Sequence, residues 1–408
     1  MENFYSFLSK KIQNQKLPYN SGKIRKVNGH IHTPFSFSAF ADMKQPFSMA
    51  VAEGISVLGI NDFYTTDGYP EFAELALKHK VFPLFNIEFI ALQKESQKAG
   101  IRINDPQNPG RTYISGKGLA YPVSFSGGAR EKMNKLMLAS NRQTYQMVDK
   151  LNLYLKDISI DLRFSAEGLH RNLARNLFRE RHIATAVRNA VFDNYTDLES
   201  IRTVLGEIMG TTIPDNIFND RAALENEIRN KLLKAGGPAY IPEDEDAFLS
   251  LDEVLELIID GGGIPCYPVL LDDAKGNLTG FEADYPDMAQ SLKDKGVYMI
   301  ELIPGRNDFR VLKDFVNFFD QEGFIITFGT EHNTPKLDPL TVSCRGGVSL
   351  DEHLLQINYR GACIIAAHQY LVSEGKEGFP TRKFPDRNRL DELSGLGEIV
   401  IENFIKSY

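Results

Sequence analysis

Short apolar runs that end in a polar or charged residue recur along the chain, and they predict buried strands of a parallel sheet. They lie at residues 23–32, 56–62, 81–88, 119–125, 263–268, 297–301 and 323–329, and the run at 119–125 is the weakest of them. The pattern therefore predicts about seven strands.

Segments with apolar residues at helical spacing separate many of these runs. They lie at residues 41–53, 69–79, 250–260, 284–295 and 309–321. Ser250 and Glu253 have the spacing of a capping box, which favours a helix that begins here. The alternation predicts an α/β fold with a parallel sheet, either open or closed into a barrel. Polar residues cluster at the carboxyl ends of the strands, where barrel enzymes place their chemistry.

Residues 130–234 interrupt the alternation, because they are charged, helical in pattern and without a convincing strand. We expect a helical insertion between two barrel strands, which serves either as a lid or packing module or as a direct substrate contact. The expected segments are a first part of the barrel at 1–129, the insertion at 130–240, a second part of the barrel at 241–340, and a C-terminal αβ extension at 341–408 that packs on the barrel and ends in a helix over 390–405.

Composition excludes several classes of protein. Hydrophobic residues make up 42% of the 408 residues, and the formal net charge is -8, which argues against a nucleic-acid-binding surface. The cysteines are three in number and form no CxxC pair, so neither a zinc knuckle nor a disulfide framework is expected. We find no signal peptide and no apolar run of roughly 18 residues, so we expect a cytoplasmic protein without a membrane partner.

The first expected strand ends in His30-Ile31-His32. Residues i and i+2 of a strand face the same side, so both imidazoles should point into one space, an arrangement that suits zinc, manganese or iron. Other strands end in acids, namely Asp62, Glu88, Glu301 and Glu331. Like charges that meet at one barrel mouth repel one another unless a cation or protons compensate, so these ends predict a metal site.

Several short motifs follow one another in a recognisable order. Residues 30–36 read HIHTPFS, 59–68 read GINDFYTTDG, 181–184 read RHIA, 237–241 read GPAYI and 329–332 read GTEH, with Glu88 at the third strand. This order resembles the polymerase and histidinol phosphatase (PHP) superfamily, in its branch of small metal-dependent phosphoesterases. The resemblance runs through Pro335 and so covers most of the chain.

The resemblance implies a distorted seven-stranded β/α barrel, similar to a TIM barrel. In active members of the family, up to three divalent ions activate a water molecule that attacks phosphorus. This chain departs from the family pattern at several ligand positions: Phe37 replaces an acid, and Phe63 and Tyr267 replace histidines. Residues 111–118, where another histidine ligand is expected, read RTYISGKG.

The ligand set that remains matches one metal of the family and consists of His30, His32, Glu88 and Glu331. Two imidazoles and two carboxylates can hold one zinc or manganese ion with a position left for water. We therefore expect one ion or none, rather than three. Asp62 and His332 are predicted either to move the proton or to hydrogen-bond the site.

The segment 104–118 holds two prolines, three glycines and the cations Arg111 and Lys117. It is either a clamp for a phosphate or carboxylate, or an ordinary polar surface loop. Arg306 is a second candidate anion ligand. His182 is either a substrate contact, as the resemblance implies, or a packed helix residue.

The leading hypothesis is a phosphoesterase that hydrolyses a small phosphorylated molecule by a metal-activated water. The alternative is a degenerate barrel that binds a phosphorylated or acidic ligand without turnover. A proofreading module associated with a polymerase fits poorly, because the chain has no polymerase segment and no basic bias.

Overall fold

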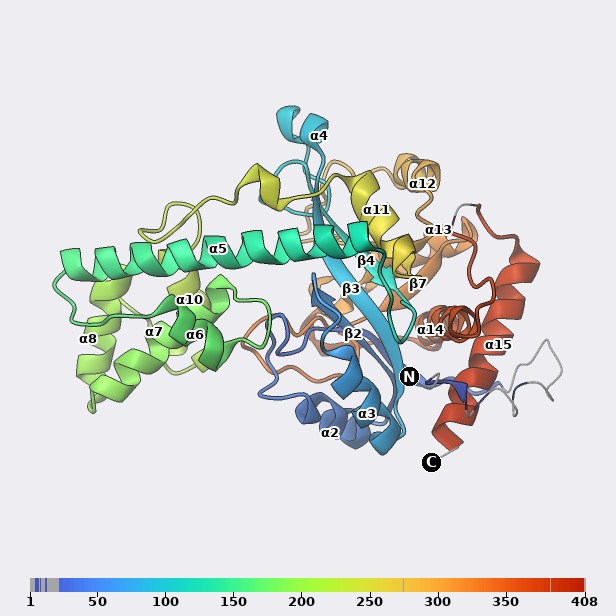
Figure 1. Ribbon diagram of the computed structural model, residues 1–408, viewed down its shortest axis with the longest axis horizontal. Helices are drawn as coiled ribbons and strands as arrows, with labels where there is room; N and C mark the ends of the chain where they lie inside the picture. The colour runs from blue at the N-terminus through green and yellow to red at the C-terminus, as the bar shows by residue number, and fades with distance from the viewer. Residues whose placement is uncertain are drawn as a thin grey trace.

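A seven-stranded sheet forms the centre of the molecule, as the computed structural model shows (Figure 1). The structure describes residues 4–6, 8, 12, 22–273, 275–381 and 383–406. The first and last residues of the expected four-segment division, 1 and 408, therefore lie outside the described residues. The strands are β1 (Lys26–Ile31), β2 (Ile55–Phe63), β3 (Phe82–Leu92), β4 (Arg111–Lys117), β5 (Ile264–Val269), β6 (Met299–Leu302) and β7 (Ile325–Phe328).

The strands pair in chain order, and the sheet curves into a nearly closed barrel. Parallel pairing holds throughout, except that β4 runs antiparallel to both β3 and β5. A parallel bridge between Ile31 and Glu331 links the end of β1 to the residues after β7. The expected α/β fold with a seven-stranded, TIM-like barrel is therefore confirmed, and the reversed β4 is its distortion.

The fourth strand differs from the expected one. The prediction of a strand at 119–125 is wrong, because this segment contains Pro122, which has no N–H to donate to a sheet ladder. The strand is instead β4, whose residues alternate between fully and partly buried over Arg111–Tyr113 and pair with β3 from Leu92 to Ile87. Half of the segment expected as a polar loop at 104–118 is thus a buried strand.

Helices cover the outside of the barrel. They are α2 (Lys44–Glu53), α3 (Tyr69–His79), α11 (Leu251–Asp260), α12 (Tyr285–Asp294), α13 (Phe309–Gln321), α14 (Glu352–Ser373) and α15 (Arg387–Lys406), with short 3-10 turns at Glu245–Ala247, Pro304–Arg306 and Arg345–Gly347. The short α4 (Lys94–Lys98) has no buried residue and protrudes from the fold (Figure 1). The capping box expected at Ser250 is present, since its hydroxyl accepts from Glu253 N–H and the Glu253 side chain accepts from Ser250 N–H. None of the helices in the described part of the chain combines the length and apolar character needed to cross a membrane.

The helices between β4 and α11 form a separate bundle with its own hydrophobic core. They are α5 (Gly127–Asp157), α6 (Ala166–Leu173), α7 (Glu180–Asn194), α8 (Leu198–Met209), α9 (Asp215–Phe218) and α10 (Arg221–Leu232). Figure 1 shows the long α5 running from the barrel to the far side of this bundle. The exact segment boundaries expected from the sequence stay a prediction, but the bundle lies where the insertion was expected.

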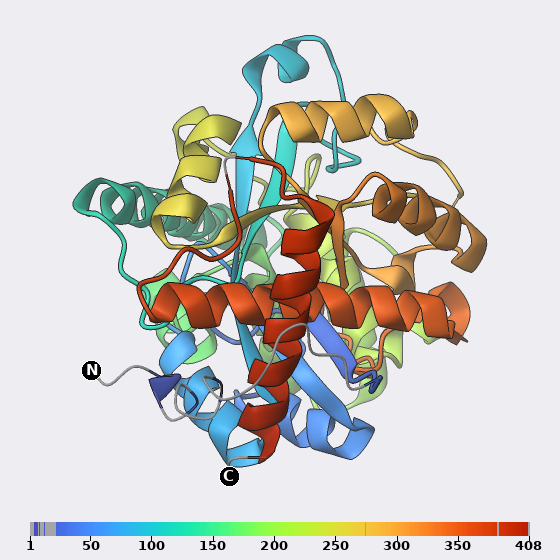
Figure 2. The same ribbon diagram turned by 90° about the vertical axis from the view of Figure 1, so that its right-hand side faces the viewer.

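The C-terminal helices close the side of the barrel opposite the bundle, where α15 crosses α14 (Figure 2). Asn358 of α14 accepts a hydrogen bond from Phe328 N–H of β7 at 2.8 Å and donates to Val27 carbonyl of β1 at 3.2 Å. It thereby joins the first and last strands of the sheet. Gly361, one turn further on, lets the helix backbone approach the Ile326 carbonyl closely. A short hairpin of β8 (Ser343–Cys344) and β9 (Val348–Ser349) precedes α14.

Candidate metal centre

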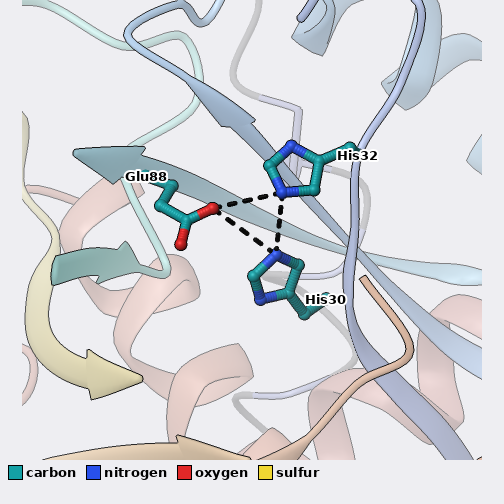
Figure 3. A group of neighbouring side chains, drawn as sticks. All are labelled: His30, His32 and Glu88. Atoms are coloured by element: carbon teal, nitrogen blue, oxygen red, sulfur yellow. Dashed lines mark hydrogen bonds and ion pairs between the residues drawn. The ribbon is translucent and has the colours of Figure 1, made fainter. Parts of the chain in front are cut away.

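Three donor atoms converge inside the barrel mouth, from the end of β1 and from β3 (Figure 3). His30 Nε2 lies 3.3 Å from His32 Nε2. Glu88 Oε2 lies 3.1 Å from His32 Nε2 and 3.8 Å from His30 Nε2. All three residues are buried, and Glu88 Oε2 has no hydrogen-bond partner among the described residues. The arrangement brings together three of the four expected ligands and can hold one metal ion.

The other ring nitrogen of each histidine has its own partner. His30 Nδ1 lies 2.9 Å from Glu301 Oε2, and because this carboxylate can only accept, the Nδ1–H of His30 donates to it. His32 Nδ1 lies 3.1 Å from Ser36 Oγ, whose hydroxyl donates to Asp62 Oδ1 at 2.6 Å. Such partners orient metal-binding imidazoles and leave the opposite nitrogen with a free lone pair. Both Nε2 atoms therefore face Glu88 as acceptors.

Glu301 is held in turn by a buried cation. Its Oε2 accepts from Lys117 Nζ at 2.5 Å, and its Oε1 accepts from Ser115 Oγ at 2.5 Å. Lys117 also donates to Asn61 Oδ1 at 3.3 Å, and Asn61 Nδ2 lies 3.0 Å from His30 Nε2. Lys117 was expected to contact an anionic substrate, but the structure buries it fully beneath the site, where Glu301 takes up its charge. Burial by itself raises the pKa of Glu301, yet Lys117 and His30 hold it well below its usual range.

The burial of the converging groups costs energy in the absence of a cation. Burial raises the pKa of Glu88 to about 8, although nearby His30 opposes the rise. Burial also lowers the pKa of His32, despite the neighbouring Asp62. Near neutral pH a proton on Glu88 compensates the metal-free site, and a divalent cation at the centre would replace that proton and pair with all three groups. The donor set therefore fits a divalent ion such as zinc or manganese.

Glu331, the fourth expected ligand, lies at the same mouth but is paired with another side chain. Its N–H donates to His30 carbonyl at 2.9 Å, and its carbonyl accepts from His32 N–H at 2.7 Å. Its carboxylate forms an ion pair with Arg306. Burial alone raises the pKa of Glu331, but Arg306 lowers it below its usual value. Glu331 and the following residue both have left-handed backbone conformations, with φ of 68° and 55°. Such conformations are strained for residues other than glycine and cluster at functional sites.

The two residues expected to move a proton have structural partners. Asp62 accepts from Thr33 N–H at 2.7 Å and from the Ser36 hydroxyl. His332 Nε2 lies 2.7 Å from Asp338 carbonyl, and its ring stacks on Phe40 at a centroid distance of 4.7 Å. Neither Asp62 nor His332 is among the described residues that line the cavity above the metal centre. The geometry assigns Asp62 to the orientation of His32 and turns His332 away.

A cavity of about 280 Å³ lies between the barrel mouth and the helical bundle, and His30 and Glu88 of the ligand group line it. Its wall carries an arginine cluster that consists of Arg179, Arg181, Arg229 and Arg306. Of these, the sequence analysis identified Arg306 alone. The others come from α7, its N-cap and α10, and they lie opposite the barrel only because the bundle folds back over it. The charged RER triplet at 179–181, beside the expected His182, was the available signal.

The arginines of the bundle share a single buried acid. Glu180 Oε1 accepts from Arg229 Nη2 at 2.7 Å, and Glu180 Oε2 lies 3.4 Å from Arg179 Nε. Lys234 Nζ also reaches Glu180 Oε1 at 3.3 Å. Arg181 donates to the neutral Asn226 at 3.0 Å. Because two arginines and a lysine pair with one carboxylate, and Arg181 with a neutral side chain, this wall of the cavity keeps an excess of positive charge.

The remaining expected substrate contacts lie outside the cavity wall. Arg111 forms an ion pair with Glu243 and lies over the Phe248 ring at 5.0 Å. His182 Nδ1 accepts from Arg179 N–H at 3.0 Å and so caps the start of α7. Burial lowers the pKa of His182 to about 3, so the ring is neutral at physiological pH. Packing and capping account for its position.

Two positions at which the PHP pattern has histidines now have other partners. The Phe63 ring stacks on His32 at a centroid distance of 4.9 Å. The Tyr267 hydroxyl donates to Glu282 Oε1 at 3.0 Å, within the barrel wall. Neither side chain is placed to ligate an ion at the convergence of His30, His32 and Glu88.

Comparisons with known proteins show a similarity of fold alone. No family model matches the chain, and no curated protein matches it in sequence. The solved structure of a candidate metal-dependent phosphoesterase from Bifidobacterium adolescentis matches with a TM-score of 0.54 at 16% identity, over 83% of this chain and 96% of its own. An amidohydrolase from Chromobacterium violaceum, with bound sulfate and no metal, matches with a TM-score of 0.50 at 15% identity, over 82% of this chain and 96% of its own. The chain therefore shares its fold with these two structures.

Proposed function

We propose that the protein is a metal-dependent hydrolase that acts on a small phosphate ester. The observation that carries this proposal is the convergence of His30 Nε2, His32 Nε2 and Glu88 Oε2 beside a cavity that is lined by His30 and Glu88 and has an arginine-rich wall. The PHP-like order of motifs and the fold of the solved structures support the same class of reaction.

His30, His32 and Glu88 would hold the ion, and Glu331 is the candidate fourth ligand. When bound, a divalent ion supplies Lewis acidity, which activates water and an ester at neutral pH. The residues of the chain position the ligand atoms for this ion. Glu301 and the Ser36–Asp62 pair fix the two imidazoles, so the ligand atoms are held in place before an ion arrives.

The arginine cluster provides the substrate contact. A phosphate group above the metal centre would face Arg306 from the barrel and Arg181 from the bundle, and guanidinium groups bind phosphate oxygens in bidentate geometry. Arg181 suits this role because its recorded partner, Asn226, is neutral. The cavity volume of about 280 Å³ limits the substrate to a small molecule.

A second candidate, ligand binding without turnover, is favoured by one observation. Asp62 and His332, the groups expected to move a proton, have structural partners away from the cavity. A site with a metal and a phosphate-binding wall but no proton donor would bind an ester and leave it intact. Release of product separates the two candidates.

The test is phosphate release from a panel of small phosphomonoesters by protein reconstituted with zinc or manganese. We expect turnover that a chelator removes and that His32→Ala lowers at least about 100-fold, since a ligand is lost. His353→Ala is the matched control, because this exposed histidine contacts Asn317 of the outer helix α13 and neither residue lines the cavity. Turnover that survives both the chelator and His32→Ala contradicts the proposal. Metal binding without any turnover on the panel favours the binding protein.

A further inference from the structure

The backbone of Glu331 is fixed to both histidine residues of the metal centre. Its N–H and carbonyl bond to the main chains of His30 and His32, which closes the barrel at this point. The Glu331 side chain is 13% exposed and lines the cavity. A carboxylate in this place has two possible partners, the ion below it and the guanidinium above it.

Arg306 holds this carboxylate in the present structure. It follows β6 in the turn Pro304–Arg306, and its side chain is 44% exposed, so it can move into the cavity without unpacking the core. Among the described residues, Arg306 pairs with no carboxylate other than that of Glu331. The three-residue ligand group of His30, His32 and Glu88 does not include Glu331. Glu331 is thus paired with Arg306 in this structure and lies outside that ligand group.

We propose that Arg306 couples anion binding to metal binding. A tetrahedral oxyanion in the cavity attracts the Arg306 guanidinium and releases the Glu331 carboxylate, which then completes the ligand set around the ion. This inference rests on the proposed metal centre and adds to it a specific order of events: the site binds metal weakly when the cavity holds no anion and tightly when an anionic substrate is present.

Thermodynamic linkage gives the coupling a measurable form. If an anion tightens metal binding by a given factor, the metal tightens anion binding by the same factor. We expect a factor of about ten, within the usual range for coupled sites. Sulfate is the probe, because it has the shape and charge of a phosphate ester and does not precipitate manganese.

The experiment is a set of calorimetric titrations of manganese into the metal-free full chain, with sodium sulfate or with sodium chloride at equal ionic strength. In the unaltered chain, sulfate should lower the manganese Kd about tenfold. In Arg306→Ala, manganese should bind about tenfold more tightly than in the unaltered chain even without sulfate, and sulfate should have little further effect. Arg181→Ala removes another arginine from the same cavity but leaves the Arg306–Glu331 pair in place. Arg181→Ala should not reproduce the tighter manganese binding that is expected of Arg306→Ala.

A double-mutant cycle separates release of Glu331 from a general charge effect. In a Glu331→Gln background there is no carboxylate to release, so adding Arg306→Ala should leave the manganese Kd unchanged. Equal tightening in both backgrounds, or no tightening at all in Arg306→Ala, overturns the inference while the metal centre itself stands. Failure of the unaltered chain to bind manganese or zinc overturns both. Circular dichroism confirms that each variant is folded.

Discussion

The ion pair between Lys117 and Glu301 is the buried charge pair on which the histidine orientation depends. We predict that Lys117→Met destabilises the protein by about 3 kcal/mol. Removal of one partner of a buried pair costs about 3–5 kcal/mol, because it leaves an uncompensated charge. Lys117 is fully buried and Glu301 nearly so, with 2.5 Å between Nζ and Oε2. The lower end of this range applies to Lys117→Met, because Ser115 still donates to the Glu301 carboxylate in this variant and His30 still lies beside it.

Urea denaturation followed by far-UV circular dichroism measures this loss, since the chain has no tryptophan. The double variant Lys117→Met with Glu301→Gln removes both charges and should recover much of the stability. Lys313→Met is the matched control, because Lys313 pairs with Asp351 at a partly exposed site, where side-chain exposures are 38% and 32%. An exposed pair contributes about 0–1 kcal/mol. If Lys117→Met costs no more than Lys313→Met, the account of the buried network is wrong.

Three further predictions follow from named contacts. Asp62→Asn weakens the support of His32 and should raise the metal Kd about 10- to 100-fold in calorimetry, and an unchanged Kd contradicts this role. His182 has a folded pKa of about 3, below its unfolded value of 6.5, so the protein should lose up to about 1.4 kcal/mol of stability per pH unit as the pH falls below 6.5. His182→Gln keeps a helix-capping acceptor and should flatten this decline in urea denaturation, which an unchanged slope would contradict. Asn358→Leu leaves two buried backbone groups of β1 and β7 without partners and should cost about 2 kcal/mol in thermal denaturation, whereas a loss near zero refutes the bridging role.

The sequence predicted the features that depend on local periodicity. The i, i+2 spacing of His30 and His32 is enough to place both rings on one face of a strand, and the structure has them there. The pattern of apolar runs located six of the seven strands. The strand that was missed, β4 (Arg111–Lys117), contains two polar residues flanked by glycine, and such a local sequence is typical of a loop. Its pairing partner β3 is what makes it a strand.

Local sequence patterns could not predict the contacts between segments that are distant along the chain. Lys117 lies 184 residues from Glu301 along the chain, and only barrel closure brings the two together. For the same reason the sequence left two interpretations of Lys117, either a substrate contact in an anion clamp or part of a polar surface loop. The arginines of the bundle escaped notice because charged helix residues usually face solvent. Their role depends on how the bundle folds over the barrel mouth, which no single helix encodes.

The central claim is that His30, His32 and Glu88 hold a divalent metal ion. Elemental analysis of protein reconstituted with zinc or manganese and then desalted tests it most directly. We predict about one ion per chain in the unaltered protein, as a site with one such ligand set requires, and loss of that ion in His32→Ala with unchanged circular dichroism. An unaltered chain that retains no zinc and no manganese, or a His32→Ala variant that retains as much as the unaltered chain, contradicts the claim.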